Sequence, residues 1–100
     1  MVDILVIERT GTCWGIERPL VRAFGRDEGR IRITLDSGCL GADRVVGMAR
    51  GAAVRPPGRV LDRYWPVPSR GLLMHEGRVV VVIDPGAPPD ALACARRSCP

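Results

Sequence analysis

The residues best suited to acid–base chemistry are His75 and Glu76, which are adjacent in the chain. A histidine beside a carboxylate can act as general acid and general base. With Gly77 they lie between two apolar stretches, where the polar residues of a hairpin turn are expected anyway. Ser69 and Asp84 could complete a nucleophilic triad, but neither a nucleophile-elbow motif nor a phosphate-binding glycine signature accompanies them. The sequence therefore predicts a protein that is not an enzyme.

The four cysteines are the other reactive side chains, and none of them forms a C-x-x-C pair. Cys13 and Cys39 fall within predicted strands, whereas Cys94 and Cys99 lie in the C-terminal tail. His75 is the single histidine, and structural zinc sites are built from close pairs of cysteine and histidine ligands. We therefore expect no metal ion, no other cofactor, and thiols kept reduced in the core or the tail.

The composition is that of an ordinary globular chain. It has 100 residues, 46% of them hydrophobic and 26% charged, which predicts one domain over residues 1–100. All 15 basic residues are arginines and the net charge is +4, so a small basic β-barrel that binds nucleic acid is the alternative function. Interspersed acidic residues, and only two Trp, one Tyr and one Phe for stacking on bases, count against nucleic acid as the partner.

The hydropathy pattern predicts a cytoplasmic protein. No stretch approaches the roughly 18 consecutive apolar residues of a membrane span. Asp3 and Glu8 interrupt the region where a secretory signal would need an unbroken apolar run. We therefore expect no insertion into the membrane.

Short strands and tight turns dominate the pattern and predict a mainly β fold, a small antiparallel barrel with one or two short helices. The expected strands are residues 3–8, 12–17, 30–36, 39–48, 71–74 and 78–84. Residues 49–70 are expected to form an ordered loop with one helical turn.

Two short helices are expected. Pro19 suits a first helical turn, Leu20, Val21 and Phe24 share one helical face, and Gly25 stands where a left-handed stop is expected. The tail, residues 85–100, is expected to be partly helical or flexible, with a helix that begins at Asp90.

Two of the predicted strands are apolar on both faces. In residues 3–8, Ile4 and Val6 oppose Leu5 and Ile7, and in residues 78–84 valines and one isoleucine occupy both faces. Both faces of such a strand must be covered, because each buried aliphatic side chain contributes roughly 1.5–3 kcal/mol. Two interpretations are open: the short helices cover these faces, or one face is a docking surface for another protein.

Three segments, in this order, are similar to CheW-like coupling domains of bacterial chemosensory arrays. They are the first hairpin with residues 16–21, residues 41–48, and residues 70–84, and the match covers most of residues 3–24 and 38–92. The order of the pieces carries the resemblance more than any one of them. Where such domains have a further stretch with an Asn-Leu-Arg-Gly turn and a Pro-Val strand, this chain has only residues 26–29. The chain thus resembles a CheW-like domain without its middle segment.

The resemblance implies two linked SH3-like barrels, here truncated, with a hydrophobic groove between them that holds the cytoplasmic helical tip of a chemoreceptor. The implied function is a non-catalytic adaptor or scaffold that binds this receptor. The missing segment leaves open whether it couples to a CheA-type histidine kinase or to another CheW-like protein.

The candidate receptor-binding residues are Leu20, Val21 and Phe24, whose matching positions line the groove of the family, with Val45 and Val46. Packing in the core is an equal alternative for the first three. Val45 and Val46 alternate faces, so one is expected in the core and the other in the groove.

The remaining polar and aromatic candidates have plainer roles. Asp43 and Arg44 are expected to form a surface ion pair or strand-end hydrogen bond rather than to orient a partner. Trp14 and Trp65 are expected to anchor the core or a loop.

Overall fold

The computed structural model describes residues 2–27, 29–55, 69–86 and 92. Over these residues the chain is built from strands and one short 3-10 turn, which confirms the mainly β fold class. The elements are β1 (Val2–Arg9), β2 (Thr12–Glu17), η1 (Arg18–Leu20), β3 (Val21–Asp27), β4 (Arg30–Leu35), β5 (Gly38–Ala42), β6 (Arg44–Ala52), β7 (Ser69–His75) and β8 (Arg78–Ile83).

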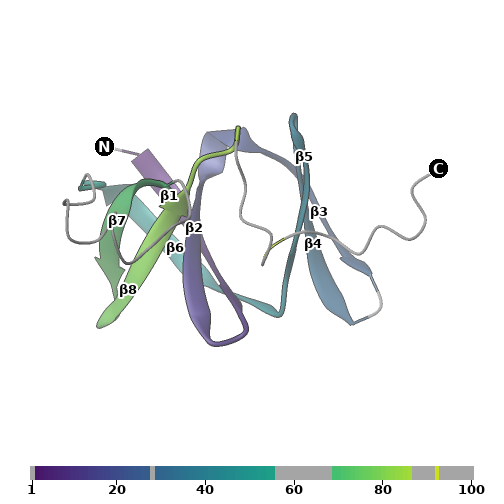
Figure 1. Ribbon diagram of the computed structural model, residues 1–100, viewed down its shortest axis with the longest axis horizontal. Coiled ribbons are helices and arrows are strands. Elements are labelled where there is room, and N and C mark those ends of the chain that lie inside the picture. The colour runs from purple at the N-terminus through teal and green to yellow at the C-terminus, as the bar shows by residue number, and fades with distance from the viewer. Residues whose placement is uncertain (1, 28, 56–68, 87–91, 93–100) are drawn as a thin grey trace.

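The strands form two sheets, which Figure 1 shows side by side. The larger sheet has five strands in the order β6-β1-β2-β8-β7, and the smaller has three in the order β3-β4-β5. Neighbouring strands are antiparallel except β2 and β8, which run parallel. The first and last described strands therefore share one sheet, and the middle of the chain forms the other.

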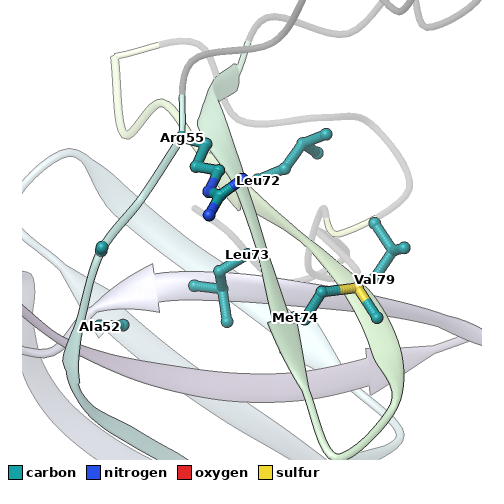
Figure 2. Close-up of a pocket in the computed structure, with 7 residues that line it drawn as sticks. Ala52, Arg55, Leu72, Leu73, Met74 and Val79 are labelled. Atoms are coloured by element: carbon teal, nitrogen blue, oxygen red, sulfur yellow. The ribbon is translucent and has the colours of Figure 1, made fainter.

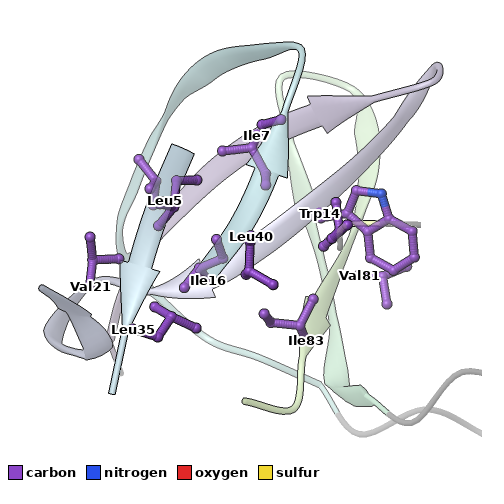
Figure 3. Close-up of a cluster of buried hydrophobic side chains, with 12 residues drawn as sticks. Leu5, Ile7, Trp14, Ile16, Val21, Leu35, Leu40, Val81 and Ile83 are labelled. Atoms are coloured by element: carbon purple, nitrogen blue, oxygen red, sulfur yellow. The ribbon is translucent and has the colours of Figure 1, made fainter. Parts of the chain in front are cut away.

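The core has two apolar clusters, one between the two sheets and one within the five-stranded sheet. The first, called here the inter-sheet cluster, lies where side chains of the two sheets point toward one another (Figure 3). Its buried members are Leu5, Ile7, Trp14, Ile16, Val21, Ile33, Leu35, Leu40, Ala42, Val81, Ile83 and Leu92. The second, called here the concave cluster, fills the concave side of the five-stranded sheet and contains Ile4, Val6, Cys13, Leu73, Val80 and Val82. Trp14 is buried in the inter-sheet cluster and is therefore a core anchor, as predicted.

The short helix predicted around Leu20, Val21 and Phe24 is wrong. Only residues 18–20 make a 3-10 turn, and the chain becomes extended at Val21 and pairs with β4 as β3. A register shift between Val21 and Ala23 inserts an extra residue. This β-bulge puts Val21 and Phe24 on the same face of a strand at a spacing of three, which is also the helical spacing.

The single strand predicted over residues 39–48 is also wrong, because the chain divides into β5 and β6 at Asp43 and the two halves join different sheets. The Asp43 N–H donates to the Glu8 carbonyl oxygen at 2.9 Å. The Asp43 carboxylate in turn accepts the Thr10 N–H at 2.9 Å. This anchoring at the tip of the β1–β2 hairpin redirects the chain, and β6 then continues to Ala52, into the region predicted as loop.

Some predicted features lie outside the described residues. They include the helical turn and Trp65 within residues 56–68, and the terminal helix after Asp90. Leu92 is the one described residue beyond Gly86, and it is fully buried in the inter-sheet cluster.

Candidate functional site

Apart from Val79 in β8, the apolar side chains of both strands that are apolar on two faces are covered by the chain itself, which contradicts the docking interpretation at those positions. Ile4 and Val6 lie in the concave cluster, whereas Leu5 and Ile7 lie in the inter-sheet cluster. Along β8, Val80 and Val82 lie in the concave cluster, whereas Val81 and Ile83 lie in the inter-sheet cluster. The predicted cover was wrong too, because the three-stranded sheet, rather than a pair of helices, packs on the face that carries Leu5 and Ile7. The other face packs within the five-stranded sheet itself.

The five candidate receptor-binding residues divide by burial. Val21 is buried in the inter-sheet cluster, and Leu20 is half-buried against it. Phe24 is 50% exposed and Val45 38% exposed, which is unusual for large apolar side chains. Val46 is half-buried and packs on the concave cluster. Two of the five, Phe24 and Val45, are therefore available to a partner.

Phe24 and Val45 stand on the faces that the two sheets turn toward each other. Phe24 is paired with Ile33, and Val45 is paired with Ile7. Directly paired residues of antiparallel strands project from the same face, and both partners are fully buried in the inter-sheet cluster. These two exposed side chains therefore flank the cluster, one from each sheet, and we call them the inter-sheet margin. Val45, not Val46, is the residue of that pair on the side of the inter-sheet cluster.

The polar residues considered for catalysis are not assembled into a triad. Ser69 begins β7 and His75 ends it, six residues on, which is roughly 20 Å along a strand. The Asp84 carboxylate accepts the Gly86 N–H at 3.0 Å and so closes a turn. His75 Nε2 lies 3.6 Å from the Glu76 carboxylate in the β7–β8 turn.

A charged network joins the β1–β2 hairpin to the starts of β6 and β8. The Glu8 carboxylate accepts hydrogen bonds from the Arg44 and Arg78 guanidinium groups, the latter at 3.0 Å. Arg78 also reaches the Gly11 carbonyl oxygen at 3.4 Å. The hydrogen bond from Arg44, and after it the hydrogen bond from Arg78, lower the pKa of Glu8 below its ordinary value. The expected strand-end role of Asp43 and Arg44 agrees with these contacts.

Acid should weaken this network. Because the pKa of Glu8 is depressed in the folded protein, its ionised form stabilises the fold above the ordinary carboxylate value of 4.5, and this contribution is lost as pH falls through the folded-state pKa. Glu8→Gln is therefore expected to be less stable than wild type at neutral pH and to approach it in acid. Urea unfolding of both proteins across this range measures the difference, and a difference that stays constant with pH would contradict the assignment.

The thiols lie apart in the described part of the chain. Cys13 is buried in the concave cluster, and Cys39 is half-buried on β5. Among the described residues no three His, Cys, Asp or Glu side chains gather as a metal site. Cys94 and Cys99 lie outside the described residues.

Sequence reasoning missed a second exposed apolar area, formed by Met74 and Val79. These residues are directly paired across β7 and β8, and they are 63% and 57% exposed. The predicted hairpin included both residues, but its expected turn at residues 75–77 would set Met74 opposite Arg78, whereas the structure pairs Met74 with Val79. Whether Met74 and Val79 are covered depends on how far the three-stranded sheet extends. The local sequence pattern does not specify that extent.

Comparison with known proteins gave no match to a protein-family model, a curated protein or a solved structure. Among the described residues no helix has the length and apolar character needed to cross a membrane.

Proposed function

We propose that this protein is a non-catalytic adaptor of a bacterial chemosensory array that binds the helical cytoplasmic tip of a chemoreceptor in the cytoplasm. The observation that carries the proposal is the inter-sheet margin, where Phe24 and Val45 are exposed on the two facing sheets. An amphipathic helix buries its apolar face against such side chains. The resemblance to CheW-like domains places a receptor groove between two β units.

The architecture supports this proposal in a second way. One sheet has five strands and the other three, which fits one complete and one reduced SH3-like barrel. The shortfall coincides with the place where β3 ends at Asp27 and β4 begins at Arg30. This is where the resemblance calls for an additional stretch. Receptor docking would need only the margin, whereas the absence of this stretch leaves open whether the protein couples to a CheA-type kinase or to another CheW-like protein.

Binding of a recombinant receptor-tip fragment tests the proposal. Phe24→Asp and Val45→Asp are each expected to weaken binding about tenfold or more, because they place a charge in the apolar contact. Met74→Asp is the control, since Met74 is at least as exposed as Phe24 and Val45 but lies on β7, the other edge strand of the five-stranded sheet from β6. Val21→Asp is unsuitable because Val21 is buried in the core.

Titration calorimetry of the folded variants provides the readout. Tip binding that is unchanged in both margin variants would overturn the proposed site. Absence of tip binding, together with nucleic-acid affinity that falls steeply with salt, would instead favour the basic-barrel alternative.

A further inference from the structure

The two edges of the five-stranded sheet approach each other at one point. β6 and β7 are its edge strands, and the chain just beyond β6 reaches β7 at Arg55. Arg55 and Leu72 exchange two backbone hydrogen bonds, with N···O distances of 2.9 and 2.7 Å. In the described part of the chain, these are the only backbone hydrogen bonds across the gap.

Glycine at position 71 permits this approach. A Cβ there would lie 2.7 Å from Val54 Cγ1 and still closer to the Arg55 carbonyl oxygen. The edges therefore meet tightly beside Gly71, whereas toward the other end of β7 no backbone hydrogen bond joins them among the described residues, and the His75 side chain lies beside Gly47 of β6.

An apolar groove of about 600 Å³ opens from this point. One wall is formed by Ala52 and Ala53 and the other by Leu72, Leu73, Met74 and Val79, with Arg55 at the closed end (Figure 2). Met74 and Val79 are among the most exposed large apolar side chains of the described chain. Val45 lies near the start of β6 and Ala52 ends that strand, and neither Val45 nor Phe24 lines the groove, so the groove is separate from the inter-sheet margin.

The wall formed by β7 presents unpaired backbone groups. Both backbone polar groups of Leu72 point across the gap to Arg55. Since these groups alternate in direction along an antiparallel strand, those of Met74 point the same way, and no backbone partner meets them among the described residues. An exposed strand edge with free N–H and C=O groups is a template for an added strand.

The closed end of the groove carries a positive charge. The Arg55 side chain lies along the groove beside Leu72 and Leu73 (Figure 2). None of the described carboxylates forms an ion pair with it. An acidic side chain on a bound segment would complement this guanidinium.

We propose that this groove receives a short extended segment of another protein as an added strand beside β7. The backbone of the segment pairs with Met74, its apolar side chains pack on Leu73 and Val79, and an acidic residue faces Arg55. Strand addition of this kind takes affinity from main-chain hydrogen bonds and specificity from the pockets for alternate side chains.

The test uses a capped synthetic hexapeptide of alternating valine and threonine that ends in aspartate, and a matched peptide that ends in lysine. Binding is followed by NMR shifts of the Met74 amide. Wild type is expected to prefer the aspartate peptide about tenfold, and Arg55→Glu is expected to reverse that preference. Arg50→Glu, the same charge change on an exposed residue outside the groove, is expected to leave it unchanged.

Strand pairing has its own readout. N-methylation of the peptide amides that face β7 is expected to abolish binding, whereas methylation of the alternate amides is not. The proposal is overturned if neither peptide binds, as when the groove is filled by the chain's own residues 56–68. It is also overturned if sedimentation shows a dimer that Met74→Asp disrupts, because a second copy would then be the occupant. None of these outcomes depends on receptor binding at the inter-sheet margin.

Discussion

Ile33→Ala is expected to lower the free energy of unfolding by about 2–5 kcal/mol, the range for removing a fully buried isoleucine side chain. Ile33 is 0% exposed, lies on the middle strand of the three-stranded sheet and belongs to the inter-sheet cluster. Its neighbours on the same face are Phe24 and Leu40. The cavity would open where the two sheets are held together, so the loss should appear in urea unfolding of the whole chain.

Ile31→Ala provides the matched control, because Ile31 lies on the same face of the same strand but is only half-buried. Its replacement should cost clearly less, since part of the side chain already contacts water. Equal costs at the two positions would mean that the sheets do not pack on each other as described. The margin formed by Phe24 and Val45 would then lose its structural basis.

Gly15→Ala is expected to cost about 1–3 kcal/mol through overpacking. A Cβ at this position would lie 2.7 Å from Ile4 Cγ2, 3.0 Å from Val80 Cγ1 and 3.3 Å from Val82 Cγ2. All three neighbours are fully buried in the concave cluster, so none can move aside freely. Thermal and urea unfolding of the variant measure the loss.

Gly25→Ala is the control for the change of residue itself. Gly25 also lies in a strand, but it is exposed, and a Cβ there would meet nothing within 4 Å. It should unfold within about 0.5 kcal/mol of wild type, as surface substitutions commonly do. If both variants were equally destabilised, the loss would come from the glycine backbone and not from the packed interior of the curled sheet.

Hairpins were the most predictable part of the fold. The first was expected at residues 3–8 and 12–17 and forms from β1 and β2, and residues 30–36 correspond to β4 almost residue for residue. Here local alternation, turn glycines and burial all favour the same structure. The last hairpin follows the same rule, since β7 and β8 turn at Glu76 and Gly77.

The errors arise where tertiary pairing decides between local alternatives. Val21 and Phe24 have helical spacing only because a bulge separates them on a strand that β4 recruits. The division at Asp43 depends on hydrogen bonds to Glu8 and Thr10, more than 30 residues away. Neither the bulge in β3 nor the hydrogen bonds of Asp43 can be predicted from a local sequence pattern.

The candidate site was predictable in composition but not in exposure. The sequence selects five apolar residues, and the fold buries Val21 and turns Val46 into the concave cluster while it leaves Phe24 and Val45 accessible. Exposure depends on where the second sheet ends. The covering of one face of β1 and of most of β8 has the same origin, because a sheet from the middle of the chain packs on that face.

Amide hydrogen exchange with and without the receptor-tip fragment tests the central claim most directly. Receptor docking at the inter-sheet margin predicts slower exchange in β3 and at the start of β6, around Phe24 and Val45, with β7 and β8 unchanged. Slower exchange confined to β7 and β8, or no change anywhere at saturating fragment, would contradict it.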